Sequence, residues 1–397
     1  MTTGLPLEGM RLVDFSQGVA GPYCAMQLAE LGAQVIKIEP AEGDWLRSVG
    51  HQVLPLESSA HLSLNRNKRS ICLNLRHPDG AHIAQALVAK SQILVQNYRV
   101  GVLEKFGLGY DQIRQANPRL VYATILGYGA QGPLASAPAT DSVMQAFGGL
   151  MSINGDGEVP LRMGNMVSDM VAGTYLSQGV LAALLTLART GKGQEVTVSL
   201  LDALLAFQSA PVAEFLDSGV LPKRSGSRHP MISPSGTYKV RDGFVTLVAT
   251  QQLWKKFCLA IGMPELTDDR RFADNDARLT NRDSLQALIT PFFAQRNREE
   301  ILGLARDHDL VCAPINDYQA LTEHEQVQAN HLLQSWTHPV LGQARGVRNP
   351  VRYGEFDPVW GPPPMLGEHT HEVLRDDLGF ADDEIARVRA SGAVTIP

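Results

Sequence analysis

One aspartate stands out in this 397-residue chain because almost no other charged residue surrounds it. Asp169 lies in the segment GNMVSDMVAGTYLSQGVLAALL, just before a long apolar stretch that is typical of a buried helix. A carboxylate in this position can stabilise a helix N-terminus through the free backbone N–H groups. Held against an electrophile in a sheltered site, it can instead act as a nucleophile that forms covalent acyl intermediates. The residues alone leave both interpretations open.

Basic residues form a second group with chemical potential. They lie around two neighbouring predicted strands: Arg66, Lys68, Arg69, Arg76, Arg99 and Lys105. Loops that follow the carboxyl ends of parallel strands face one crevice, so these cations are placed to converge on one phosphorylated ligand. Lys and Arg form charge-assisted hydrogen bonds to phosphate. A solvated surface is the alternative interpretation, and the sequence does not decide between the two.

The turn Gly18-Val19-Ala20-Gly21 follows the first predicted strand, and Glu39 lies about twenty residues further on. This spacing is weakly suggestive of dinucleotide binding, but the GxGxxG fingerprint is absent. Glycines that allow close packing of strand and helix explain the turn more simply. A turn at a helix N-terminus still offers backbone N–H groups to an anion.

Other chemistries find little support. The chain contains no G-x-S-x-G, GxxxxGK[ST] or HExxH motif. Its four cysteines are too far apart for a zinc site or a disulfide framework, and we expect no metal. The net charge of −6 argues against nucleic-acid binding. The first residues show no signal peptide, and the apolar run 180–188 is too short to span a bilayer. We therefore expect a soluble cytoplasmic protein without membrane partners.

The elements that must position these residues alternate along the first half of the chain. Strand, helix and strand within the first forty residues form a βαβ unit, which requires a right-handed crossover. Further strands are expected at 70–75, 93–98 and 120–129, with helices at 81–91, 111–118 and 173–193. This pattern predicts an α/β fold with a Rossmann-like open parallel sheet and helices on both faces.

A change in composition predicts how the rest of the chain is organised. We expect the first part of a large α/β domain at 1–205 and a linker at 206–230. A β-hairpin with Asp242-Gly243 as its turn, followed by helices, predicts a smaller α+β domain at 231–325. Residues 326–397 are expected to return to the large domain and complete it.

Six blocks, in order along nearly the whole chain, resemble the class III CoA-transferase family (CaiB/BaiF, formyl-CoA transferase-like). They are LVDFSQGVAGPYCAMQLAELGAQVIKIEPAEGDWLR, NRNKRSICLNL, LVQNYRVGVLEKFGLGYDQI, NPRLVYATILGYGAQGP, DMVAGTYLSQGVLAALLTLARTGKGQEVTVSLLDALL and PPPMLGEHTHEVL. One block would be a chance match, whereas six in the same order are specific.

The resemblance implies an acyl-CoA:carboxylate CoA-transferase that works through an aspartyl anhydride and an aspartyl-CoA thioester on Asp169. It places Val19 and Ala20 beside the CoA thiol, and Asp141 as an accessory acidic residue. The positions that match contacts to the adenine and phosphates are Leu73, Arg76, Asn97, Tyr98 and Lys105. CoA thioesters and small carboxylic acids are the implied partners, with no tightly bound cofactor. Two protomers of this family interlock as rings, so a homodimer is expected.

Two departures from the family pattern leave the substrate open. KIEPAEGD lacks the Arg that often follows the Glu, and the run of four glycines of oxalate-specific members is missing. Four residues are candidates to meet a second carboxylate, which would favour succinyl-CoA as donor: Arg162, Arg224, Arg228 and His229. The alternatives are an α-methylacyl-CoA racemase, which Thr140 disfavours because it cannot act as a base, a non-catalytic CoA-binding homologue, or a dehydrogenase.

Overall fold

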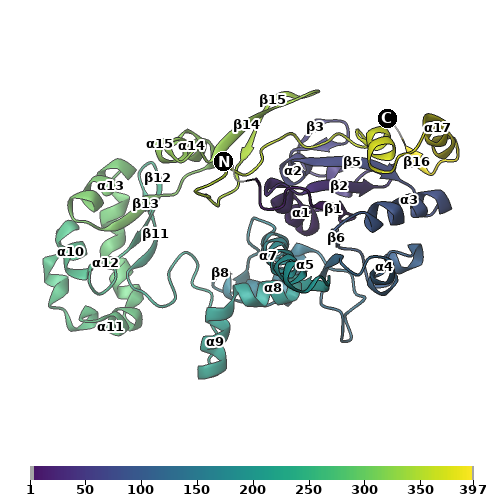
Figure 1. Cartoon of the computed structure of the whole chain (residues 1–397). Coiled ribbons are helices and arrows are strands. Elements are labelled where there is room, and N and C mark those ends of the chain that lie inside the picture. The colour runs from purple at the N-terminus through teal and green to yellow at the C-terminus, as the bar shows by residue number, and fades with distance from the viewer. Residues whose placement is uncertain (1–3, 396–397) are drawn as a thin grey trace. The chain divides into compact units, whose positions relative to one another are not determined.

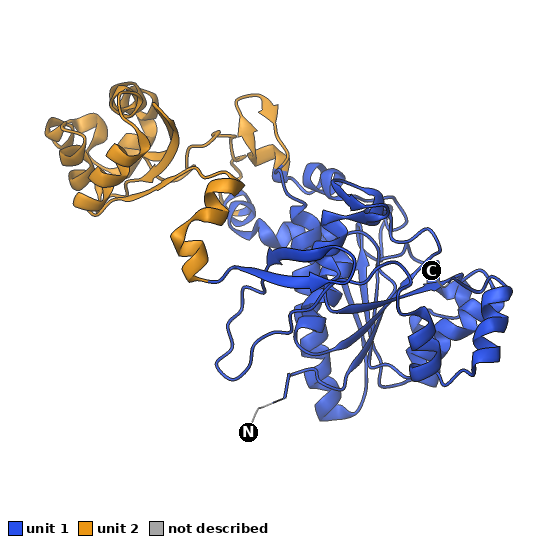
Figure 2. Ribbon diagram, turned by 90° about the horizontal axis from the view of Figure 1, so that it is seen from above, with its two compact units in different colours: residues 1–150, 163–216, 331–397 blue, residues 151–162, 217–330 orange. Residues whose placement is uncertain are grey.

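The computed structural model describes residues 4–395 (Figure 1). Within them the chain forms two compact units (Figure 2). Unit 1 comprises residues 1–150, 163–216 and 331–397, and unit 2 comprises residues 151–162 and 217–330, apart from the residues outside the described range. The chain therefore leaves the first unit twice and ends in it.

A seven-stranded sheet forms the centre of unit 1, in the order β10-β7-β6-β1-β2-β5-β16. Six strands are parallel, and only β16 runs antiparallel to its neighbour β5. Their bounds are β1 Arg11–Asp14, β2 Gln34–Glu39, β5 Lys68–Leu73, β6 Ile93–Gln96, β7 Val121–Leu126, β10 Glu195–Ser199 and β16 Val394–Thr395. The six parallel strands follow the order of doubly wound nucleotide-binding folds, with a switch between β1 and β6.

Helices cover both faces of this sheet. The helices that lie wholly in unit 1 are α1 Ala20–Glu30, α2 Ser59–Leu64, α3 Pro78–Ala89, α4 Tyr110–Ala116, α5 Asp141–Phe147, α7 Val167–Thr190, α8 Leu200–Phe207, α16 Thr370–Glu372 and α17 Asp382–Ala390. The helices α6 Leu150–Ile153 and α9 Ser209–Ser218 run from unit 1 into unit 2. Shorter elements are the 3-10 turns η1 Trp45–Ser48 and η2 Leu103–Phe106, the π-helical turn η5 Val373–Asp377, and the strand pairs β3 Gln52–Leu54 with β4 Glu57–Ser58 and β14 Leu333–His338 with β15 Gly342–Val347.

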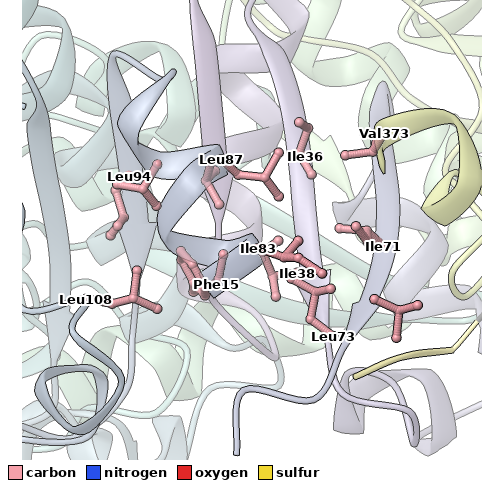
Figure 3. Close-up of a cluster of buried hydrophobic side chains, with 14 of the residues drawn as sticks. Phe15, Ile36, Ile38, Ile71, Leu73, Ile83, Leu87, Leu94, Leu108 and Val373 are labelled. Atoms are coloured by element: carbon pink, nitrogen blue, oxygen red, sulfur yellow. The ribbon is translucent and has the colours of Figure 1, made fainter. Parts of the chain in front are cut away.

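One face of the sheet is apolar (Figure 3). Ile38 of β2, Leu73 of β5 and Phe15, which follows β1, belong to the same apolar cluster as Leu87 of α3 and Val373 near the end of the chain. Side chains alternate across a strand, so this face takes every second residue. Because Val373 belongs to the last segment, that segment contributes directly to the core of unit 1.

The other face carries buried charges between β1, β2 and β5. Asp14 lies opposite Lys37 in the neighbouring strand, and Lys37 lies opposite Ser70 in the next. All three side chains are fully buried, together with Lys68. The Lys68 ammonium donates to Asp14 Oδ2 at 2.9 Å. Buried charges must be paired to be tolerated, and these are.

Unit 2 contains the predicted β-hairpin. Strands β11 Ser235–Val240 and β12 Gly243–Val248 are antiparallel and joined at Asp242, and β13 Val311–Pro314 pairs with β12. The other elements are β8 Gly155–Asp156, β9 Val159–Pro160, α10 Trp254–Ala260, η3 Pro264–Thr267, η4 Arg270–Phe272, α11 Asn275–Thr280, α12 Arg282–Ala294, α13 Arg298–Asp307, α14 Tyr318–Glu323 and α15 Glu325–Ala329. A separate apolar core includes Phe257, Phe272 and Phe293.

The mixed α/β fold with a large, mainly parallel sheet agrees with the sequence prediction. Two details differ. The helix expected at 173–193 begins at Val167, so Asp169 lies within its first turn and not before it. The stretch 206–230, expected to be a linker, contains α9. The chain stays helical there because SAPVAEFLDS places its proline in the first turn, where no backbone N–H is needed.

Helix α7 is long and apolar enough to cross a membrane by length and composition. It packs against α1, α8, β7 and β10, and 44% of its most apolar window is buried. These contacts identify it as a core helix of unit 1.

Close packing of α7 on α1 depends on Gly173. A Cβ atom there would lie 2.5 Å from the carbonyl oxygen of Ala20, a distance that real Cβ atoms do not adopt. We expect Gly173→Ala to lower the free energy of unfolding by about 1–3 kcal/mol, as overpacking does. Gly303→Ala in α13 is the matched control, because its Cβ would have only Arg306 at 3.8 Å. It should be neutral or stabilising by about 0.5–1 kcal/mol. Urea unfolding of both variants is the measurement, and equal effects would contradict this packing argument.

Candidate active site

The candidate site lies at the switch between β1 and β6, where the order of the parallel strands reverses. Loops that follow neighbouring strands diverge there and leave a crevice at the carboxyl edge of the sheet. The loop after β1 contains Gln17, Gly18 and Val19, and the loop after β6 begins with Asn97 and Tyr98.

Hydrogen bonds hold the first loop from both sides. Asn97 accepts from the Gln17 N–H at 2.9 Å and donates to the Gln17 carbonyl at 2.7 Å. The Gly18 N–H donates to the carboxylate of Asp44 at 2.9 Å, and Lys37 donates to the same carboxylate at 3.0 Å. Burial alone would lower the pKa of Lys37, but the attraction of the surrounding carboxylates outweighs it and raises that pKa. The loop is thus anchored to a charged, buried ion pair.

The loop presents backbone donors at the start of α1. Among the described residues, the N–H groups of Val19, Ala20 and Gly21 have no acceptor. Val19 and Ala20 are also nearly fully buried. Buried N–H groups are normally paired, and the N-terminus of a helix favours negative charge. The start of α1 is therefore suited to receive an anionic oxygen.

Asp169 lies in the first turn of α7, on the part of that helix that packs against α1. Gly173, one helical turn further on, contacts the start of α1, and residues four apart share a face of a helix. Met166 and Met170, which flank Asp169, pack against the cluster that contains Val19. Val19 and Ala20 at the start of α1 and Asp169 in the first turn of α7 thus belong to two helices that pack together, although they lie some 150 positions apart in the sequence.

Asp141 fixes the start of α7 from outside that helix. Its carboxylate accepts from the backbone N–H of Ser168 at 2.9 Å and from the Ser168 hydroxyl at 2.8 Å. It also accepts from Gln145 Nε2 at 2.8 Å, and Gln145 accepts from the Met163 N–H. The helix has no side-chain cap of its own. Asp141 therefore takes the place of the missing N-cap.

The environment of Asp169 keeps its acid form stable. Burial raises the pKa of Asp169 to about 7, and the nearby negative charge of Asp141 adds to the effect. Both influences disfavour the charged form. Carboxyl groups with a perturbed pKa occur most often at functional sites. Asp169 is therefore a candidate reactive group, on a helix that packs against α1.

A cleft of about 550 Å³ opens at the carboxyl ends of β1, β2, β5 and β6. Its apolar lining includes Ile38, Leu73, Leu75, Val102 and Phe106. A flat aromatic base fits such a lining, and the volume is typical of a small-ligand site.

The polar part of the cleft contains further predicted residues. Arg76 and Tyr98 line it, and Gln17 donates to the Tyr98 hydroxyl at 3.1 Å. Lys105 lies on η2, between two residues that line the cleft. Asn97 is occupied in holding the first loop, which is a positioning role that the sequence did not suggest.

The six basic residues fall into two sets. Lys68 is fully buried and bound to Asp14, which excludes it as a phosphate ligand. Arg66 pairs with Glu30, and Arg69 pairs with Glu372 and Asp377. A structural role accounts for these three. The side chains that make no ion pair or hydrogen bond with any described residue are those of Arg76, Arg99 and Lys105. Only this second set is available to an anionic ligand.

Glu39, the residue behind the dinucleotide interpretation, is fully buried. Arg47 donates to both of its oxygens, at 2.7 and 2.8 Å, and Ser70 donates to it at 2.6 Å. A carboxylate taken up in this way cannot bind a ribose hydroxyl. Sequence reasoning also missed Gln17 and Asp44, although both lie in the first of the six family-like blocks.

The residues considered for a second carboxylate all belong to unit 2. Arg224 donates to three backbone carbonyls, and Arg228 pairs with Asp283. His229 accepts from the Met231 N–H. These partners give Arg224 a structural role within unit 2. No group of three metal-ligating side chains occurs between residues 4 and 395.

Comparison with known proteins places this geometry in context. The sequence profile of CoA-transferase family III matches residues 7–370. The chain is 35% identical to the succinyl-CoA:glutarate CoA-transferase of Mus musculus over 394 residues, which cover 98% of this chain and 90% of that protein. It is 33% identical to the succinate–glutarate CoA-transferase of Agrobacterium fabrum over 385 residues, which cover 94% of this chain and 95% of that protein. A crystal structure of a CAIB/BAIF family protein from Brucella suis covers 94% of this chain and all of its own, with 31% identity and a TM-score of 0.86.

The raised pKa of Asp169 predicts a pH-dependent stability. A carboxyl group whose folded pKa exceeds its unfolded value loses stability as the pH rises from about 3.8 to about 7. Asp169→Asn, which cannot ionise, should therefore be more stable than the natural protein at pH 8, by roughly 1–2 kcal/mol. The two should be equally stable near pH 4. Thermal unfolding at both pH values is the measurement.

Asp141→Asn provides the matched variant, because it removes the neighbouring charge and leaves an acceptor for Ser168. It should lower the pKa of Asp169 and reduce the gain that Asp169→Asn shows at pH 8. An Asp169→Asn variant that is no more stable at pH 8 than at pH 4, relative to the natural protein, would contradict the buried environment.

Proposed function

Because the chain belongs to CoA-transferase family III, we propose that it moves CoA from a donor thioester to a carboxylic acid through covalent intermediates on Asp169. The chain is an enzyme, a class III CoA-transferase. The observation that supports the proposed mechanism is the raised pKa of Asp169 in the first turn of α7, the helix whose Gly173 meets the start of α1.

In the proposed reaction, CoA passes from one acyl group to another through Asp169. An Asp169 oxygen attacks the thioester carbon of the donor and expels CoA thiolate, which leaves a mixed anhydride. The thiolate attacks the Asp169 carbonyl carbon and expels the donor acid, which leaves an aspartyl-CoA thioester. The acceptor carboxylate then attacks that carbonyl carbon and expels the thiolate. In the last step the thiolate attacks the acyl carbon of the acceptor and releases the Asp169 carboxylate.

Each part of the site has a role in this scheme. The ionised Asp169 is the nucleophile, and a raised pKa makes it a stronger one. Each attack creates a tetrahedral oxyanion, and we assign its stabilisation to the N–H groups of Val19 and Ala20, which have no acceptor among the described residues. Asp141 holds the turn that carries the nucleophile. The cleft at the ends of β2 and β5 would hold the adenosine, with Arg76 and Lys105 available to the phosphates.

The donor that we propose is succinyl-CoA, with a dicarboxylic acid as acceptor. Support comes from two relatives that are named for succinyl-CoA or succinate together with glutarate. We propose a cytoplasmic location, where CoA thioesters are available.

We also propose that the protein is a homodimer. Large apolar side chains are exposed on unit 1 at Phe147, Tyr175, Leu185, Leu205 and Phe207. Exposed apolar patches mark interaction sites. They lie on α5, α7 and α8, which are packed together, so a second copy is a suitable partner for them.

The function is tested by trapping the covalent enzyme. The natural protein, mixed with succinyl-CoA and treated with borohydride, should show a mass change confined to Asp169, because borohydride reduces an aspartyl thioester. Asp169→Asn should show none and should lose transfer to glutarate by on the order of 10³-fold or more. The rate of adduct formation should rise with pH to a plateau, with a midpoint near 7, since only the ionised Asp169 attacks.

The alternatives give different results in the same experiment. Exchange of the α-proton of a branched acyl-CoA without any adduct would indicate the racemase. Tight CoA binding without an adduct from succinyl-CoA or other thioesters would indicate a binding protein. Asp202→Asn is the control, because it makes the same chemical change at an exposed acidic residue in the first turn of α8, and it should keep full transfer.

The dimer is tested by light scattering with size-exclusion chromatography. The natural protein should have twice the mass of the 43.2 kDa chain. Replacing Leu185 and Phe207 by Asp should produce monomer, because a buried unpaired charge opposes association. A control with Val311→Asp, which changes an exposed apolar residue of unit 2, should remain dimeric. A natural protein of 43.2 kDa would contradict the proposal.

A further inference from the structure

The charges around the cleft do not match the charges of a whole CoA molecule. Arg76 is the one basic residue among those that line the cleft, and Glu42 is an exposed acidic residue in the same lining. Arg99 and Lys105 are the sequence neighbours of the lining residues Tyr98 and Phe106, and they make no ion pair with any described residue. The remaining acid of the lining, Glu39, is neutralised by Arg47. Within residues 4–395, the lining and the positions next to it thus offer three cations and one opposing carboxylate.

CoA has two anionic groups in its nucleotide half. The diphosphate carries about two negative charges, and the 3′-phosphate monoester carries about 1.5 to 2 more at neutral pH. Three cations less one carboxylate compensate the diphosphate and leave the 3′-phosphate largely without a partner. The loop Pro40-Ala41-Glu42 follows β2 and adds a carboxylate, and no cation, to the lining of the cleft.

We propose that this cleft recognises CoA through its adenosine and diphosphate and not through its 3′-phosphate. Dephospho-CoA and its thioesters should therefore be bound and used nearly as well as CoA and its thioesters. Glu42 is the residue that sets this selectivity, because its charge opposes the 3′-phosphate. The apolar lining by Leu73, Leu75 and Phe106 supplies base contacts that both ligands share. This inference rests on the proposed function, since it takes the cleft as the CoA site.

The test compares the binding of CoA and 3′-dephospho-CoA to the natural protein by calorimetry. The Kd for dephospho-CoA should exceed that for CoA by less than tenfold, and a ratio of tenfold or more would overturn the proposal. Succinyl-CoA and succinyl-dephospho-CoA should give the same ratio in kcat/KM for transfer to glutarate.

Variants then test the proposed role of Glu42. Glu42→Gln should lower the Kd for CoA at least threefold and leave the Kd for dephospho-CoA unchanged. This gain in CoA affinity should shrink in 0.5 M salt, since exposed charges are screened. Pro40→Arg, which adds a cation to the same loop, should raise the ratio of the Kd for dephospho-CoA to the Kd for CoA further. Asp111→Asn is the control, because it removes an exposed carboxylate on α4 outside the cleft. A ratio that Glu42→Gln leaves unchanged would refute the role of Glu42.

Binding and covalent trapping separate this inference from the proposed function. If neither nucleotide binds, the cleft is not the CoA site and the inference fails. If both bind with similar Kd but no adduct forms on Asp169, the proposed mechanism fails and the selectivity stands.

Discussion

The site depends on one buried ion pair, between Lys37 of β2 and Asp44 in the loop that follows it. Two charges without exposure to water are stable only when each has further partners. Here the ammonium also donates to the Ser16 carbonyl, and the carboxylate also accepts from the Gly18 N–H. Those two additional bonds lie on either side of Gln17, so satisfying the charges fixes the conformation of the loop after β1. The loop in turn determines where the unpaired N–H groups of α1 point. The arrangement of the active site thus follows from the need to pair a buried lysine.

The same reasoning extends across one face of the sheet. Side-chain alternation puts Asp14, Lys37 and Ser70 on that face, opposite one another in neighbouring strands. Arg47 joins Glu39 and Glu57 and also donates to the Pro364 carbonyl, at 3.4 Å, so the network reaches the last part of the chain. Burial raises the pKa of Glu57 to about 7 even though Arg47 opposes the shift. A carboxyl group whose pKa is raised in the folded protein destabilises the fold when it ionises. The network therefore fixes the geometry of these side chains more than it stabilises the fold.

The sequence predicted the sheet, the main helices and the hairpin of unit 2 because each depends on local periodicity and turn residues. Asp169 could be singled out because its surroundings contain almost no other charge. The roles of the basic residues could not be separated, since Lys68 and its partner Asp14 are 54 positions apart and only the sheet brings them together. The role of Asn97 was hidden for the same reason: its side chain serves a loop 80 positions away. The start of α7 was misplaced because its cap is supplied by Asp141 and not by a neighbouring residue.

Asp169 is subject to opposing influences, and their balance suits a group that must attack and then leave. Burial and Asp141 raise its pKa, which strengthens the carboxylate as a nucleophile. The dipole at the start of α7 favours its charged form, and this helps it to depart from an anhydride. If Asp169 lay in a solvated position it would ionise easily but attack weakly, whereas a fully buried one would attack only after a costly ionisation. Asp141 makes this balance possible. Its carboxylate holds the first turn of α7 through Ser168, and its charge raises the pKa of Asp169. Geometry and reactivity at Asp169 are therefore set by the same side chain, and only a substitution that keeps an acceptor for Ser168, such as Asp141→Asn, separates the two.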